Sequence, residues 1–345
     1  MNGLLTGCQR GAPAMPPLIY AALAIGQASN IAGALDGTIG AFEVYDWALR
    51  ADEVMRHYSA GLGTPPAFIG VLDRLVAAPA DAWNLPRLTG GYAGPCINVR
   101  RDSDSARQDI GFTPAGDLDV ATLFAFVGAG NGPVATWHDQ TGHGAPLVQA
   151  VAAQQPAIVT AGQLNVLSHG LQPCMTTNGG ASGANGQFMQ TATQAPSLTF
   201  AQPFTRSSVI GVSSMTPQYG NPIVMDSGID QYAELYESSA STLDMYPYDI
   251  TGDGGSGFTG LANGYIGVVL ETFSQSTSAC TFNGVSQTES VCAGGSTMLC
   301  LSAAVGSGER CAAMNYSDMI VFGQTLAATD QTLLMASQRA YCGTP

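Results

Sequence analysis

The chain has no lysine and little charge of any kind. Its 345 residues include 11 arginines against 25 acidic residues, which gives a net charge of −14, and only 10% of the residues are charged. Nucleic-acid backbones and anionic membrane surfaces both attract clustered positive charge. The most apolar early run, residues 17–26, is about half as long as the roughly 20 residues that span a bilayer. We therefore expect neither a nucleic-acid partner nor a membrane partner.

Motifs for metals and cofactors are also lacking. The eight cysteines form no CxxC pair and no Cys/His cluster with the spacing of zinc ligands. His138 and His143 share one turn, where solvated or turn-packing roles are expected. There is no phosphate-binding loop and no GxSxG motif, so we expect no metal and no cofactor. The cysteines leave two alternatives open, which are buried thiols and disulfides between near neighbours such as Cys300 and Cys311.

Short strands separated by glycine-rich turns fill residues 164–323. Segments such as Tyr265–Thr272 and Ala279–Phe282 are rich in β-branched and aromatic residues, and the chain contains 43 glycines. Asn283-Gly284 is the clearest hairpin signal, because both central residues of a type I′ turn need positive φ. Many strands at short intervals without long helices indicate an all-β sandwich.

A polar turn follows a predicted strand at Cys96–Arg100. Arg100 and Arg101 are followed by Asp102, Asp104 and Asp109, and we expect these carboxylates to pair with the arginines.

A short helix and a tight turn come next in the same stretch. Asp117 can cap a helix over Leu118–Val127, which Gly128 closes. After a strand at Val134–Trp137, Asp139 can accept backbone N–H bonds in a turn at Asp139–Gly142.

The same residues carry a family resemblance. The segments YAGPCINVRRDSDSARQDIGF, TWHDQTGHG and AAQQPAIV, all within residues 83–160, are similar to the opening of the α-L-arabinofuranosidase B catalytic domain. Many phage and bacterial surface proteins share that module. The resemblance implies a concanavalin A-like antiparallel β-sandwich, or jelly roll, with a few short helices over residues 83–345.

The beginning of the chain resembles a different domain. The segment DGTIGAFEVYDWALRADEVMRHY at Asp36–Tyr58 is similar to the closing strand and helix of laminin-G-like and concanavalin A-like domains. Residues 1–62 would then be a partial domain that must lean on another domain or chain, because so few strands cannot cover both faces. The alternative is a partly disordered remnant. Apolar residues at helical spacing predict a linking helix over residues 63–82.

The resemblance implies where catalytic groups should lie. The family's nucleophilic glutamate matches Tyr246 in the segment Leu243–Tyr246, where Asp244 persists, and the loop of the acid matches residues 304–308, which hold no carboxylate. Glu309 follows this loop. A retaining glycosidase needs two carboxyl groups, so we expect no catalytic residues.

What remains is a surface suited to sugars, because aromatic faces and carboxylates contact sugar C–H groups and hydroxyls. The expected carbohydrate-binding residues are Tyr232, Glu234, Tyr236, Asp244, Tyr246 and Tyr248. The alternative is that Tyr232 and Tyr236 only face the core.

The resemblance implies a component of a phage or phage-like particle. We expect a non-catalytic head or tail spike or fibre protein at the virion surface that binds cell-surface or capsular polysaccharide. Residues 1–62 would contact other virion proteins, and a homo-oligomer is expected because appendages are usually symmetric. The alternatives are a secreted glycoside hydrolase and a purely structural adaptor.

Overall fold

The computed structural model describes residues 68–167, 172–179, 186–192, 194–214, 222–227, 233–239, 241–247, 257–289, 294–303 and 310–343. The chain divides into two units at residues 66 and 67, and every described residue belongs to the second unit. The predicted partial domain at residues 1–62 lies outside the described residues.

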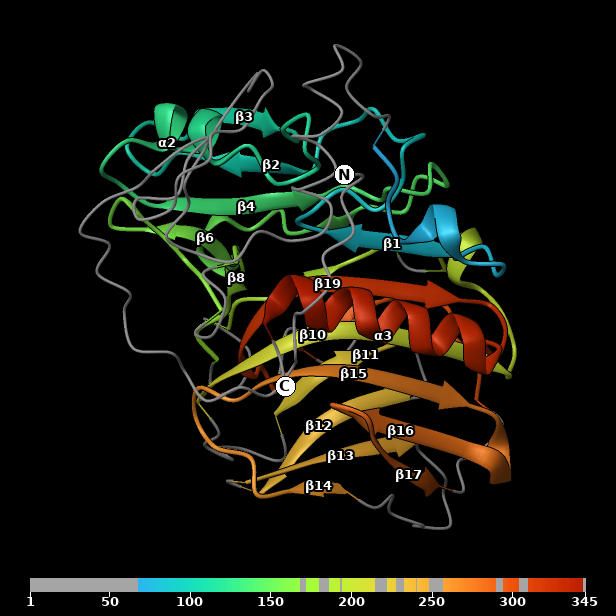
Figure 1. Ribbon diagram of the computed structural model, residues 1–345. Helices are drawn as coiled ribbons and strands as arrows, with labels where there is room; N and C mark the ends of the chain where they lie inside the picture. The colour runs from blue at the N-terminus through green and yellow to red at the C-terminus, as the bar shows by residue number, and fades with distance from the viewer. Residues whose placement is uncertain are drawn as a thin grey trace, which may run out of the picture. The chain divides into compact units, whose positions relative to one another are not determined.

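The second unit is an antiparallel β-sandwich, as the sequence predicts (Figure 1). The first strands of sheet I are, in spatial order, β17 (Val285–Glu289), β16 (Ser278–Phe282), β15 (Ile266–Phe273), β10 (Phe204–Ser214) and β19 (Ala313–Phe322). On its other side, β19 pairs with β1 (Asp81–Asn84) along one half and with β8 (Met175–Thr176) along the other. The sheet continues from β8 to β6 (Ala157–Thr160) and β7 (Gln163–Leu164).

Sheet II forms the other layer. Its strands are, in spatial order, β14 (Gly257–Thr259), β13 (Thr242–Pro247), β12 (Ala233–Ser239), β11 (Ile223–Asp226), β18 (Cys300–Leu301), β9 (Met189–Gln190), β5 (Leu147–Val148), β4 (Gly132–Trp137), β2 (Ile97–Arg100) and β3 (Arg107–Ile110). The first half of β4 pairs with β6 and its second half with β2 and β5. This one strand therefore joins the two sheets.

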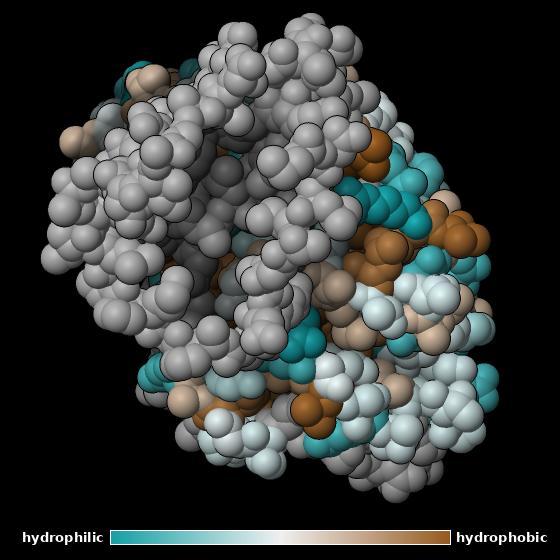
Figure 2. Space-filling view, in the orientation of Figure 1, coloured by the Kyte–Doolittle hydropathy of each residue, from teal (hydrophilic) through white to brown (hydrophobic). Residues whose placement is uncertain are grey.

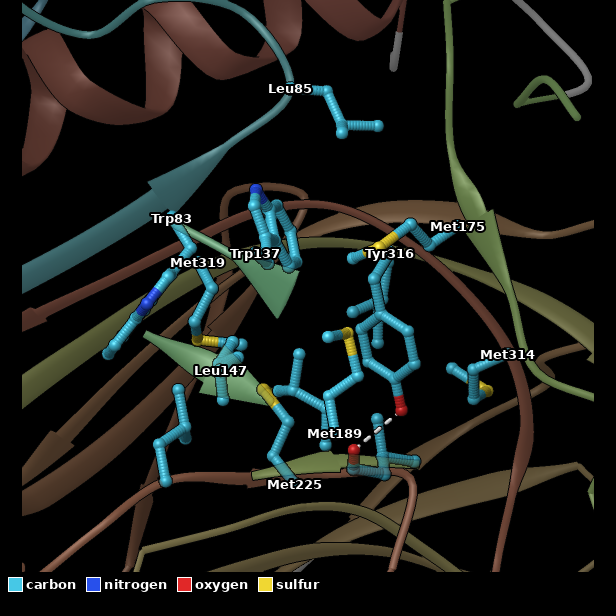
Figure 3. Packing of buried hydrophobic residues seen from close by; sticks show 14 of the residues in the cluster. Trp83, Leu85, Trp137, Leu147, Met175, Met189, Met225, Met314, Tyr316 and Met319 are labelled. Atoms are coloured by element: carbon cyan, nitrogen blue, oxygen red, sulfur yellow. Dashed lines mark hydrogen bonds between the residues drawn. The ribbon is translucent and has the colours of Figure 1, made fainter. Parts of the chain in front are cut away.

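The interior between the sheets is rich in methionine and tryptophan (Figure 3). Trp83 and Trp137 are fully buried, and Figure 3 shows them beside a group of methionine side chains contributed by both sheets. The hydroxyl of Tyr316 in this core donates to the Val224 carbonyl at 2.6 Å. Because methionine is flexible and polarizable, it fills the irregular space between two twisted sheets.

Helices are few in the described chain. The α-helices are α2 (Val120–Val127) and α3 (Ala328–Cys342), and the 3-10 helices are η1 (Leu72–Arg74), η2 (Ala152–Gln154), η3 (Pro196–Leu198) and η4 (Gln275–Thr277). Helix α3 lies over β19 and β15 in Figure 1 and packs Leu334 against Ile320, Phe322 and Leu270. It therefore covers the outer face of sheet I.

Two local predictions need correction. The cap of α2 is Asp119, whose carboxylate accepts from the Thr122 N–H, and not Asp117, because the two residues after Asp117 are still outside the helix. Gly128 closes the helix with a φ of 67°, as expected. The Asn283-Gly284 hairpin is confirmed, with φ values of 49° and 86° in the link between β16 and β17.

The linking helix expected over residues 63–82 is not seen in the part described, which begins at Phe68. Only η1 is helical there, and β1 starts at Asp81. Side chains take up the backbone donors that a helix would use: Asp73 accepts from the Gly70 N–H, and Asp330 of α3 accepts from the Val76 and Ala77 N–H groups. These tertiary bonds override the helical spacing of the apolar residues.

Candidate functional site

The predicted sugar-binding residues centre on the hairpin of β12 and β13. In this ladder Tyr236 is directly opposite Asp244, and both side chains are half-buried. Leu235 and Leu243 are buried in the core between the sheets. Since side chains alternate along a strand, Tyr236 and Asp244 share the opposite, outer face of sheet II, and the alternative that Tyr236 faces the core is wrong.

Two more predicted residues form the next pair on the same face of the ladder. Glu234 is paired with Tyr246, two residues along from the Tyr236 and Asp244 pair, although the side chains of Glu234 and Tyr246 are outside the described structure. Tyr232, Tyr248 and the loop at residues 304–309 also lie outside it. The register thus brings four of the six predicted positions together and leaves two untested.

A carboxyl group that the sequence reasoning missed lies on the inner face of the same hairpin. Glu237 is paired with Leu243, is 1% exposed, and has one carboxylate oxygen without a hydrogen-bond partner among the described residues. Burial raises the pKa of Glu237 to about 7. Alternation from Leu235 was the signal that could have placed Glu237 in the core.

The other end of sheet II holds a cavity of about 480 Å³. It lies where β4 passes between the sheets, and its lining includes Pro133, Ala157 and Thr176, which are cross-strand neighbours on β4, β6 and β8. The polar side chains that line it are Arg100, Asp102, Asn131, Gln155, Thr160, Thr176, Asn178 and Gln187. Sequence reasoning singled out Arg100 and Asp102 only as an ion pair.

Arg100 is held firmly at this cavity. Its guanidinium forms a 2.7 Å ion pair with Asp102 and donates to the Gln155 side-chain oxygen at 2.8 Å. Gln155 in turn donates to the Gln149 carbonyl at 2.9 Å, and both glutamines are buried. The polar lining is therefore fixed before any ligand arrives.

A second cavity of about 430 Å³ lies beside Tyr92 and Phe112, whose rings meet edge to face at 6.2 Å. The Tyr92 hydroxyl donates to the Pro95 carbonyl, and burial raises the pKa of Tyr92 to about 12. The Arg87 side chain donates to the Thr89 and Gly90 carbonyls. These bonds turn the polar atoms of this cavity toward the backbone.

The charges of the polar turn follow the prediction in part. Arg101 pairs with Asp104 at 2.6 Å, and Arg100 pairs with Asp102. Asp109 accepts instead from the Asn98 amide at 2.8 Å, because β2 and β3 set these two residues opposite each other. That part of the prediction was wrong.

Other features of the described chain bear on function. It contains no cluster of three or more side chains suited to hold a metal ion, and none of its helices has the length and hydropathy needed to cross a membrane. Cys300 is a buried thiol, which excludes the Cys300/Cys311 disulfide. Figure 2 shows the hydrophobic residues of one face as small separate areas among polar ones.

Comparison with known proteins places the fold but not the activity. No family model and no curated protein matches the chain. Among solved structures, a mutant GH54 α-L-arabinofuranosidase soaked with 4-nitrophenyl α-L-arabinofuranoside is similar with a TM-score of 0.56 and 12% identity, and an arabinofuranosidase complexed with arabinofuranosyl-α-1,2-xylobiose with 0.52 and 13%. Each comparison covers 79% of this chain and 64% of the other, which is less than two thirds. The chain therefore has the arabinofuranosidase type of β-sandwich.

Proposed function

We propose that this chain is a non-catalytic carbohydrate-binding module on a surface appendage of a phage or phage-like particle. The observation that carries the proposal is the β12–β13 ladder, which sets Tyr236 opposite Asp244 on the outer face of sheet II. An aromatic ring beside a carboxylate suits a sugar ring, since the ring covers C–H groups and the carboxylate accepts from hydroxyls. The sandwich is also shared with proteins whose solved complexes contain arabinofuranosyl sugars.

A glycan array tests the binding function. The intact protein should bind one class of host-surface glycan, and Tyr236→Ala or Asp244→Asn should weaken that binding at least about tenfold, the loss expected for a central contact. Tyr246→Ala and Tyr248→Ala test two of the three other predicted tyrosines. A blank array for the intact protein would favour the purely structural adaptor.

A hydrolase is the second candidate, and one observation favours it. Glu234 and Asp244 belong to pairs that are two residues apart in the ladder, so they are diagonal neighbours on one face, roughly 7–8 Å apart along the sheet. Pairs of carboxyl groups at such separations serve inverting glycosidases. An assay with aryl arabinofuranosides tests this candidate. Release of the aryl group by the intact protein, and its loss in Glu234→Gln and Asp244→Asn, would show that the protein is a hydrolase and not a binding module. Glu309→Gln tests the remaining acid.

The place of the protein in a virion needs its own test. Purified particles should contain this chain, and cross-linking should join residues 1–62 to other structural proteins of the particle or to a second copy of the chain. A secreted monomer that is absent from particles would contradict this part of the proposal.

A further inference from the structure

The cavity beside Arg100 has no role in the function proposed above, yet it has the build of a binding site. Its volume of about 480 Å³ falls within the range of small-ligand pockets, roughly 300–1,000 Å³. Small side chains, among them Ala153 and Ala157, leave the space open, and the polar groups surround it. We propose that this cavity binds a neutral saccharide and is separate from the β12–β13 surface.

The donors and acceptors of the cavity match those of sugar hydroxyls. Asn178 and Gln187 are locked to each other, because the Asn178 N–H donates to the Gln187 side chain at 3.0 Å and the Gln187 N–H donates to the Asn178 side chain at 3.3 Å. Both bonds use the amide oxygens. The two amide nitrogens have no hydrogen-bond partner within the described chain, so they remain as donors in a cavity that Asp102 also lines.

The charge of the cavity selects a neutral ligand. The Arg100 guanidinium would attract an anion, but Asp102 lies 2.7 Å from it and cancels its charge. The remaining polar side chains that line the cavity are amides and threonines. A carboxylated or sulfated sugar would meet the Asp102 carboxylate within a chain of net charge −14, and an amine would meet Arg100. A ring with several hydroxyls satisfies both partners of the ion pair at once.

Arg100 is already positioned for such a ligand. Besides Asp102 and Gln155, it reaches the Ala152 carbonyl at 3.4 Å, and only 11% of its side chain is exposed. A guanidinium has five N–H donors, and these contacts use three of them. The two others can bind without any loss of side-chain freedom, which removes one of the usual costs of binding.

The cavity and the β12–β13 surface are far apart in sheet II. Five strands, β4, β5, β9, β18 and β11, separate β2 from β12. At about 4.8 Å per strand the two places are roughly 25–30 Å apart, so a substitution at one leaves the other intact.

The test measures saccharide binding by calorimetry and ligand-observed NMR. The probes are neutral oligosaccharides of arabinose, xylose, galactose and glucose, with oligogalacturonate and sialyllactose as acidic counterparts. At least one neutral saccharide should bind. The double variant Asn178→Ala with Gln187→Ala should weaken this saccharide binding about tenfold or more. Ala153→Trp fills the cavity without removing a hydrogen bond and should weaken the binding by the same factor.

A matched variant controls the test. Ala121→Trp adds the same bulk on the exposed side of α2 and should leave the affinity for the saccharide unchanged. Binding that is lost in Tyr236→Ala but kept in the cavity variants would overturn the second site while leaving the proposed function standing. The absence of neutral-saccharide binding, or tighter binding of the acidic probes, would also overturn it.

Discussion

The carboxyl groups at the two ends of sheet II have pKa values shifted in opposite directions. Near β2 and β4, Asp104 is paired with Arg101, which holds its pKa at about 2, and hydrogen bonds from Thr122 hold the pKa of Asp119 below its usual value. On β12, burial raises the pKa of Glu237 to about 7. The carboxylates of the first end are partnered and charged, whereas Glu237 is buried and one of its oxygens has no hydrogen-bond partner among the residues that the structure describes.

This difference separates a preorganised region from one that can respond to its surroundings. Partnered carboxylates fix turns and side chains at any neutral pH, which suits the cavity beside Arg100. A buried carboxyl near its pKa changes protonation around neutrality, so the β12–β13 hairpin is expected to depend on pH. Substitutions at each end can test this contrast.

Removal of the Asp139 carboxylate should have the largest effect. Its oxygens accept from the backbone N–H groups of Ala82, Thr141 and His143 at 2.9–3.0 Å. Asp139→Ala would leave these donors unpaired in a partly buried turn, so the free energy of unfolding should fall by about 3 kcal/mol. Urea denaturation measures the change, and Asp104→Ala, an exposed pair, is the control that should change little. A loss for Asp139→Ala that is no larger than the loss for Asp104→Ala would show that the Asp139 carboxylate does not hold this turn.

Glu237→Gln should act in the opposite direction. The folded pKa of about 7 lies above the ordinary value of 4.5, so the folded protein keeps a proton that the unfolded chain releases between these values. The stability contributed by Glu237 is therefore complete below about pH 4.5 and is lost as the pH rises toward 7. Glutamine, which carries no charge, should raise the free energy of unfolding by about 2 kcal/mol at pH 8 and change it little at pH 4.

Denaturation curves at the two pH values, with the intact protein and with Glu237→Gln, measure this difference. A variant whose stability relative to the intact protein is the same at both pH values would show that Glu237 is charged in the folded state, and the two ends of sheet II would then not differ.

The same contrast explains what the sequence could predict. The pairing of Arg101 with Asp104 and the turn around Asp139 join residues within five positions of one another, so local chemistry determined them. Alternation from Leu235 places Glu237 on the inner face of its strand, but its full burial depends on β11 and the opposite sheet, and the Arg100 cavity depends on β6 and β8, which are distant in sequence. The predicted linking helix was wrong for the same reason, because Asp330 lies more than 250 residues away from its partners.

Asp102→Asn should have the smallest effect on stability and the sharpest effect on selectivity. The ion pair with Arg100 is at the surface, where Asp102 is 40% exposed, so the free energy of unfolding should change by less than about 1 kcal/mol. Asparagine keeps an oxygen near Arg100, loses the hydrogen bond that Asp102 accepts from the Asn131 amide at 3.1 Å, and removes the negative charge. The cavity then carries the uncompensated charge of Arg100, and calorimetry should show weaker binding of the neutral saccharide and new binding of oligogalacturonate. If the preference between the neutral and acidic probes stays the same, the ion pair does not set the selectivity of this cavity. The paired charges near β2 and β4 would then have only a structural role.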